Sequence, residues 1–213
     1  MLILGGGFIV WCAAELAFEL ASQLADAARR GHGELCLDME SSAYVDATLT
    51  LFERLRREGR QEVSTVLQSY LQRTPEDLER LLALSPRPAL RIVKGAYSEP
   101  APVAYQDKAA VDAAFRELVY RTLEAGARVN VATHDERILG EVRAFVRGAR
   151  LSPERYEFQL LYGVKPRLQA HLTERGEPVR VYVPFGEDWY GYFSRRLAER
   201  PANLAFVLRG LTG

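Results

Sequence analysis

The sequence predicts an α/β protein built as a (β/α)8 TIM-type barrel that is incomplete at its N-terminus. Six short apolar runs each precede a helical pattern, and this strict alternation is typical of a parallel sheet covered by helices. Polar residues recur at the carboxyl ends of the runs, where a barrel gathers them around one mouth. The chain has 213 residues, fewer than the about 250 of an ordinary barrel, and about six βα units are visible.

We expect an atypical segment over residues 1–14 and the barrel over residues 15–213. The segment is apolar, and its Gly5, Gly6 and Gly7 do not open a βα unit of the kind that binds dinucleotides. It has no basic N-terminal region and is too short to span a bilayer. It is a strand, a poorly formed anchor or sequence foreign to the barrel, and as a strand it would make a seventh unit.

The elements follow one another in a regular order. A helical pattern over residues 15–30 ends at Gly31, a typical C-terminal signal. Thr74 and Asp135 each stand where a helix N-cap is expected. The expected strands cover residues 34–39, 62–68, 89–95, 128–133, 156–161 and 179–183. The later helices are expected over residues 44–57, 74–84, 107–124, 135–146 and 165–174.

Composition and charge argue against several classes of function. The 28 basic and 28 acidic residues cancel, so the chain lacks the positive field that nucleic-acid binding needs. Cys12 and Cys36 have neither metal-ligand spacing nor a secreted-domain pattern, which favours a reducing, cytoplasmic compartment. The sequence holds no HExxH, CxxC, Walker or GxSxG motif, which weakens the case for metal, ATP or acyl-transfer chemistry.

The polar residues at the strand ends favour a barrel over an open, doubly wound sheet. An open sheet would spread them along a crevice, whereas a barrel brings them to one mouth. These residues are Asp38, Gln68, Arg91, Lys94, Thr133, His134, Gln159 and Tyr182.

Two cations, Arg91 and Lys94, lie on a strand that is otherwise apolar. Charges on a buried strand are costly unless they are paired, so a bound anionic or electron-rich ligand is one explanation. The other is a bridge inside the barrel mouth from Arg91 to Asp38 or to Glu157. The adjacent Gly95 allows a close approach to the backbone.

A helical segment near the C-terminus carries Arg195 and Arg196, followed by Glu199. Adjacent positions on a helix point about 100° apart, so the pair can grip a carboxylate from two directions, and Glu199 can brace either arginine. The alternative is a solvated, arginine-rich helix with an ordinary ion pair. Elsewhere, Thr133 and His134 end a strand just before a helix, where backbone N–H groups favour phosphate binding.

Five motifs occur in order along the chain: residues 91–97 (RIVKGAY), 132–134 (ATH), 156–163 (YEFQLLYG), 181–186 (VYVPFG) and 195–199 (RRLAE). Together they resemble the successive motifs of the proline dehydrogenase family, and in particular its single-function bacterial members. The resemblance runs from about residue 15 to residue 211.

The resemblance implies a distorted (β/α)8 barrel that binds FAD and oxidises L-proline to Δ1-pyrroline-5-carboxylate, a step of proline catabolism. The implied chemistry is hydride transfer from proline to the flavin, for which the protein supplies orientation and electrostatics. In this family, electrons pass on to a membrane quinone. The resemblance therefore implies a cytoplasmic protein with peripheral contact at the inner face of the cytoplasmic membrane.

The resemblance also implies roles for individual residues of the substrate site. Arg195 and Arg196 match the pair that binds the proline carboxylate, and Glu199 matches the helix acid near the substrate. Tyr182 matches the tyrosine that packs against the substrate ring.

The implied cofactor site lies on the earlier strands. Arg91 matches the arginine that faces the flavin N5 side, and Asp38 matches the active-site aspartate, so catalytic roles fall to Asp38, Arg91 and Tyr182. The positions that resemble FAD contacts are Met39, Gln68, Arg91, Lys94, Gly95, Ala96, Thr133 and His134.

The chain departs from the family pattern at its N-terminal end. Family members carry two more strands upstream, the second with an active-site lysine, whereas no lysine here precedes Lys94. An alternative is therefore a truncated barrel fragment of this family that is catalytically impaired or inactive. A third hypothesis is a different barrel enzyme, such as a lyase that uses Lys94 as a Schiff base.

Overall fold

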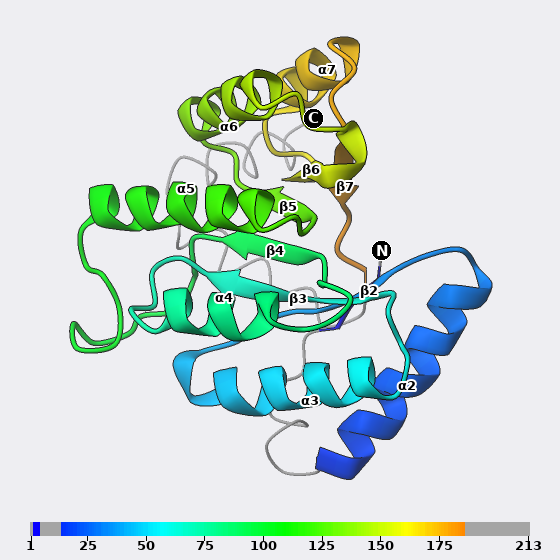
Figure 1. Cartoon of the computed structure of the whole chain (residues 1–213). Helices are drawn as coiled ribbons and strands as arrows, with labels where there is room; N and C mark the ends of the chain where they lie inside the picture. Colours follow the sequence, from blue (N-terminus) through cyan, green and yellow to red (C-terminus); the bar gives the residue numbers. More distant parts are fainter. Residues whose placement is uncertain (1, 5–13, 186–213) are drawn as a thin grey trace, which may run out of the picture.

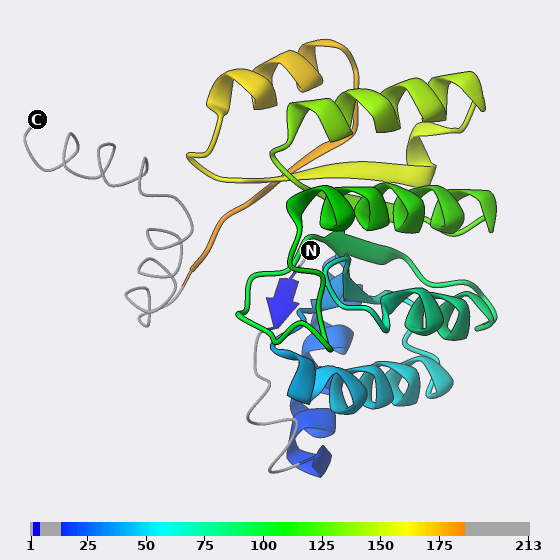
Figure 2. The same ribbon diagram turned by 90° about the vertical axis from the view of Figure 1, so that its left-hand side faces the viewer.

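The structure is a computed structural model that describes residues 2–4 and 14–185. Figure 1 shows one parallel sheet that curls into a half-barrel, with helices along its outer side. After a quarter turn the helices appear as a layer beside the strands (Figure 2). The alternating architecture expected from the sequence is therefore confirmed. The arginine-rich segment with Arg195, Arg196 and Glu199 lies outside the described residues.

The sheet contains seven described strands, and hydrogen-bonded neighbours follow the order of the chain. All the ladders are parallel; Thr65 lies opposite Leu90, for example, and Asn130 lies opposite Glu157. Six strands match the six predicted runs, and residues 2–4 form the additional strand. The strands are β1 (Leu2–Leu4), β2 (Leu35–Leu37), β3 (Val63–Gln68), β4 (Leu90–Val93), β5 (Val129–Ala132), β6 (Tyr156–Leu161) and β7 (Val179–Tyr182).

The described helices lie between the strands, within a few residues of their predicted bounds. They are α2 (Ala14–Arg30), α3 (Val45–Arg57), α4 (Thr74–Leu82), α5 (Lys108–Glu124), α6 (Glu136–Gly148) and α7 (Pro166–Glu174), with short 3-10 turns η1 (Ser42–Tyr44) and η2 (Pro153–Arg155). The Gly31 N–H donates to the Ala27 carbonyl at 3.1 Å, which ends α2 where the sequence predicts. None of the described helices is long and apolar enough to cross a membrane.

The hydrophobic core lies between the sheet and the helices. Successive strand residues point to opposite faces, so Leu90 and Ile92 of β4, both fully buried, pack outward against the helical layer. Phe115 of α5 and Phe52 of α3 are fully buried on the helix side. Each such side chain contributes about 1.5–3 kcal/mol when it leaves water. The other face of each strand is left to line the inside of the curl.

The two predicted N-caps, Asp135 and Thr74, can be compared with the structure at the starts of α6 and α4. The Asp135 carboxylate accepts from the backbone N–H groups of Arg137 and Ile138, at 3.2 and 3.5 Å, so its predicted role as the N-cap of α6 is confirmed. The prediction for Thr74 is wrong, because Arg73 is the N-cap of α4. The Thr74 hydroxyl instead donates to the Gln68 carbonyl at 2.6 Å, which ties the start of the helix to the end of β3.

The sheet curls strongly enough to bring distant strands face to face. Strands three apart in a flat sheet lie about 14 Å from one another. Yet the guanidinium carbon of Arg91 on β4 lies 5.7 Å from the ring centre of Tyr182 on β7. Arg128, just before β5, likewise pairs with Glu34, just before β2. This curl is what a barrel requires and an open sheet does not provide, and it brings the strand ends together as a mouth.

Candidate active site

Asp38, Arg91 and Tyr182, the three predicted catalytic residues, lie together inside the mouth. Asp38 directly follows β2, and its Oδ1 is 3.5 Å from Nη1 of Arg91. The Arg91 guanidinium also lies over the Tyr182 ring, close enough for a cation–π interaction. Arg91 thus contacts both the acid that follows β2 and the aromatic ring on β7, which approach it from opposite sides of the curled sheet. The Asp38 bridge, one of the two predicted for Arg91, is observed.

Arg91 keeps hydrogen-bonding capacity for a ligand. Its side chain is only 13% exposed. Its Nε is buried and has no hydrogen-bond partner among the described residues, and the contact of Nη1 with Asp38 lacks hydrogen-bond geometry. A buried donor without a partner is unfavourable by about 1–3 kcal/mol. A ligand that accepts hydrogen bonds at this point would remove that penalty.

Gln68 and Met39 lie beside this group, at the ends of β3 and β2. The Gln68 Nε2 donates to the Glu40 carbonyl at 3.2 Å, while its Oε1 is buried without a partner among the described residues. Met39 is 7% exposed, and its backbone N–H donates to Asp38 at 3.2 Å. The mouth therefore offers an unused acceptor from Gln68 as well as the unused donor of Arg91.

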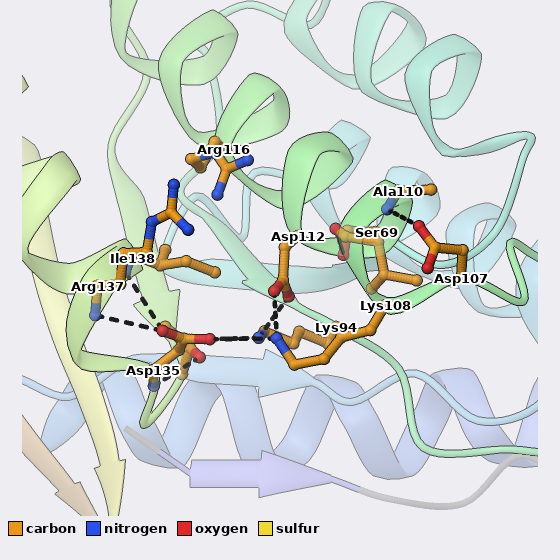
Figure 3. Close-up of polar contacts among 12 residues, drawn as sticks. Ser69, Lys94, Asp107, Lys108, Ala110, Asp112, Arg116, Asp135, Arg137 and Ile138 are labelled. Atoms are coloured by element: carbon orange, nitrogen blue, oxygen red, sulfur yellow. Dashed lines mark hydrogen bonds and ion pairs between the residues drawn. The ribbon is translucent and has the colours of Figure 1, made fainter.

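Lys94 turns toward the helices at the mouth, where two carboxylates hold it (Figure 3). Its Nζ is 2.6 Å from Asp112 on α5 and 3.0 Å from Asp135, the N-cap of α6. Lys108 pairs with the same two carboxylates. Burial alone would raise the pKa of Asp112 and of Asp135, but contacts with the lysines outweigh it and hold each pKa below its ordinary value. An ammonium in two ion pairs is poorly placed to attack a carbonyl, which argues against the Schiff-base hypothesis.

Gly95 is approached closely by a neighbouring ring. Its φ is +116°, a conformation that residues with a Cβ rarely adopt, and an added Cβ would overlap the ring of Tyr70. The Tyr70 N–H donates to the Lys94 carbonyl at 2.9 Å, which holds the backbone that carries the ring next to Gly95. Packing of Tyr70 thus accounts for the glycine. The neighbouring Ala96 is exposed.

Thr133 and His134 organise the link between β5 and β6. Thr133 Oγ1 accepts from the Asp135 N–H at 3.2 Å, and His134 Nε2 accepts from the Leu161 N–H at 2.9 Å. Because that histidine nitrogen accepts, the proton of a neutral ring resides on Nδ1. Asp135 itself accepts from early N–H groups of α6, so part of the predicted phosphate-binding capacity there is already used.

A charged layer at the amino ends of the strands was not predicted. Glu157 Oε1 accepts from Arg180 Nε at 2.7 Å, and Oε2 lies 3.3 Å from Arg128, which also pairs with Glu34. Burial would raise the pKa of Glu157, but hydrogen bonds from Arg180 and Gln159 and the nearby positive charge hold it below its ordinary value. Glu157 is therefore paired with Arg128 and Arg180, and the alternative Arg91–Glu157 bridge is not the arrangement found. Charged residues at the starts of the strands were the sequence signal from which this layer could have been predicted.

Two contacts between loops were also missed. The Tyr97 hydroxyl donates to the Glu40 carboxylate. Glu99 accepts from both the backbone N–H and the hydroxyl of Ser42, each at 2.7 Å. These contacts fasten the loop after β4 to the loop after β2 across the end of β3. No periodicity or motif in the sequence indicates such pairs, which are 57 residues apart.

Comparison with known sequences points to one family. The family described as proline dehydrogenase matches residues 13–209 of the chain. Proline dehydrogenase of Deinococcus radiodurans is 50% identical over 198 residues, which cover 92% of this chain and 63% of that protein. Proline dehydrogenase 1 of Bacillus subtilis subsp. natto is 40% identical over 197 residues, covering 92% of this chain and 64% of the relative. The chain thus spans a little less than two thirds of the length of these relatives.

Solved structures show the same fold. Proline utilization A from Bdellovibrio bacteriovorus, inactivated by N-propargylglycine, superposes with a TM-score of 0.79 at 25% identity, over 86% of this chain and 21% of that one. A variant of proline utilization A from Bradyrhizobium japonicum gives a TM-score of 0.74 at 23% identity over the same shares of the two chains. The TIM-type fold class predicted from the alternating pattern is confirmed.

Proposed function

The chain belongs to the proline dehydrogenase family, and we propose that it binds FAD and oxidises L-proline to Δ1-pyrroline-5-carboxylate. The observation that carries the proposal is the convergence of Asp38, Arg91 and Tyr182 inside the mouth. Arg91 and Tyr182 lie on β4 and β7 and Asp38 directly follows β2, so the three are far apart in the sequence. Each occupies a position that the family resemblance assigns to the catalytic centre.

The residues at the mouth fit a flavin. The flavin ring system carries hydrogen-bond acceptors along one edge and an N–H donor between them. Arg91 offers an unused donor and Gln68 an unused acceptor, both buried. Lys94 and the loop at Thr133 and His134 supply the positive charge and polar groups that the phosphates require. The other proposed contacts are Met39, Gly95 and Ala96.

When bound, the flavin supplies the two-electron oxidation of the proline ring, and the protein supplies position and charge. The fixed positive charge of Arg91 stabilises negative charge that develops next to it, in a site where little water weakens the interaction. Asp38 holds the guanidinium in place. Tyr182 presents a ring against which the apolar face of proline packs, with the Arg91 cation behind it. Arg195 and Arg196, braced by Glu199, bind the proline carboxylate.

The electrons leave to a quinone in this proposal, because the family resemblance implies a membrane acceptor. The protein would then be cytoplasmic and would touch the inner face of the cytoplasmic membrane only peripherally. A short-chain quinone and a water-soluble dye, compared as acceptors for the same preparation, test this part. Faster reduction of the quinone supports it, whereas turnover with the dye alone argues against it.

The central test is spectroscopic. The full chain, purified with FAD, should show the flavin absorption bands, and L-proline added without oxygen should bleach them. D-proline at the same concentration is the control, because an arginine pair that orients one carboxylate discriminates between enantiomers. A chain that stays colourless in excess FAD would overturn the proposal. Bound flavin that proline never bleaches would instead favour the catalytically impaired alternative.

A further inference from the structure

The cluster around Lys94 contains a second lysine that the proposed function does not use. Lys108 is the first residue of α5, and its side chain is 75% exposed. Its Nζ contacts Asp112 and lies 3.6 Å from Asp135. Lys94 contacts the same carboxylates, at 2.6 and 3.0 Å. Two lysines thus share two acids, and Figure 3 shows the two ammonium groups side by side, with Asp112 facing both and Asp135 approaching from one side.

Local helix energetics do not explain Lys108. The N-terminus of a helix carries partial positive charge, so a cation in the first turn is disfavoured there. Asp107 already caps α5, accepting from the Ala110 N–H at 2.9 Å. Lys108 therefore lies where the helix repels it and the two carboxylates attract it. The hydrogen bond with Asp112 raises the pKa of Lys108, so the side chain is positively charged at neutral pH.

The two carboxylates compete with a ligand for Lys94. Asp112 is 14% exposed and Asp135 is 25% exposed, so water screens their charges only in part. Asp112 gives one oxygen to each lysine, and Asp135 gives one to Lys94 and the other to the start of α6. Without Lys108 the two acids would share a single cation. The Lys94 ammonium would then be held more firmly away from any phosphate.

We propose that Lys108 is a positioning residue for the cofactor: it neutralises Asp112 and Asp135 and so leaves the Lys94 ammonium available to a flavin phosphate. This inference rests on the proposed function, because it takes Lys94 as a cofactor contact. Lys108 itself need not touch the cofactor. Its effect is on charge balance, since the four groups together are neutral with Lys108 and carry one net negative charge without it.

The test measures FAD affinity of the full chain by quenching of flavin fluorescence, with no turnover required. We expect Lys108→Met to raise the Kd for FAD about tenfold, from loss of a charge next to partly buried ion pairs. Lys108→Arg keeps the charge and should stay within about threefold of wild type. The matched control is Lys165→Met, which removes a lysine paired with Glu136 at 2.6 Å at the start of α7; it should change the Kd less than about twofold.

The double variant Lys108→Met with Asp112→Asn separates charge balance from a structural role. It restores neutrality, so the Kd should return to within about threefold of wild type, whereas independent losses would add. A double variant that binds FAD no better than Lys108→Met would overturn the inference, as would wild-type affinity in Lys108→Met. If the wild-type chain itself fails to bind FAD, the proposed function falls and this inference falls with it. Thermal melting of each variant confirms that the chain remains folded.

Discussion

Arg91 connects the fold to the proposed chemistry at the scale of a single residue. It lies between Leu90 and Ile92, both fully buried against the helices, so alternation along β4 turns its side chain inward. The sequence therefore predicts an arginine inside the mouth. It leaves two partners open, because only the curl of the sheet determines which acid is within reach. That acid is Asp38, while Glu157 is engaged by Arg128 and Arg180.

Gly95 is a residue for which the sequence predicts a close approach to the backbone without identifying the group that approaches. A glycine after β4 indicates a close approach to the backbone, and the structure identifies the approaching group as the ring of Tyr70. The ring belongs to a loop that follows β3, and the sequence gives no sign that it reaches this point. The glycine is needed both for its φ of +116° and for the space its missing Cβ leaves.

We expect Gly95→Ala to lower the free energy of unfolding by about 2–4 kcal/mol, through an unfavourable φ and overlap with Tyr70. Gly59→Ala is the matched control, since Gly59 has a φ of +86° but nothing within 4 Å of an added Cβ. It should lose only the backbone part, about 1–2 kcal/mol. Urea denaturation of both variants measures the difference. Equal losses would show that the Tyr70 ring yields without cost.

At the scale of elements, the strands and helices follow closely from the sequence. Apolar runs of period two and helical spacing are local signals, and the burial of each outward face agrees with them. The exceptions depend on contacts that are distant in sequence. Thr74 has the residue type of an N-cap, but the Gln68 carbonyl takes its hydroxyl. The hydrogen bond from Tyr97 to Glu40 is not indicated by any local pattern in the sequence.

Asp135 caps α6 and also pairs with Lys94, so its loss should lower stability more than the loss of Asp107, which caps α5. We expect Asp107→Ala to lower the free energy of unfolding by about 1 kcal/mol, the usual loss of an N-cap. Asp135→Ala should cost about 2 kcal/mol, since it removes the cap of α6 and the 3.0 Å partner of Lys94 together. Denaturant unfolding measures both losses.

A neutral variant separates the two contributions of Asp135. Asp135→Asn keeps an oxygen that caps α6 but loses the charge that pairs with Lys94, so its loss should fall between those of wild type and Asp135→Ala. Hydrogen exchange of the first amides of α6 should rise in the alanine variant and stay low in the asparagine variant. If Asp107→Ala and Asp135→Ala lose equal stability, Lys94 contributes nothing to the fold through this acid.

At the scale of the whole molecule, charged side chains connect strands across the inside of the curl. Arg128 pairs with Glu34 before β2 and with Glu157 on β6, and Glu157 in turn pairs with Arg180 on β7. Hydrogen bonds of the sheet join only neighbouring strands, whereas this layer joins strands three apart. Inward-pointing charges are visible in the sequence, but their pairing depends on the curvature, which no local pattern specifies. The mouth and this layer therefore had to be seen in three dimensions.

Glu157 makes the stability of this layer depend on pH. Its pKa in the folded chain is below the ordinary value of 4.5, because hydrogen bonds from Arg180 and Gln159 outweigh the effect of burial. A lowered pKa means that the ionised group stabilises the fold fully above pH 4.5, and that this stabilisation is lost as the pH falls through the lowered pKa. Glu177, held by Arg143 beside Tyr156, has its pKa shifted in the same direction. We expect the free energy of unfolding to fall steadily with acidification below pH 4.5.

Glu157→Gln isolates one part of this loss, because it keeps the shape of the side chain and removes the charge between Arg128 and Arg180. At pH 7 it should lower the free energy of unfolding by about 1.5–3 kcal/mol, since it weakens the hydrogen bonds that the buried Glu157 carboxylate makes with the partly exposed Arg128 and Arg180. The difference in stability between wild type and variant should narrow as the pH falls from 4.5 through the lowered pKa of Glu157. The control is Glu154→Gln on the exposed turn η2, which should change stability by less than about 0.5 kcal/mol. A gap that keeps the same size from pH 7 to pH 3 in denaturant titrations would show that ionised Glu157 does not hold the strands together. A difference in stability that disappears at low pH would show that the ion pairs of Glu157 connect β5, β6 and β7 and that acid breaks them.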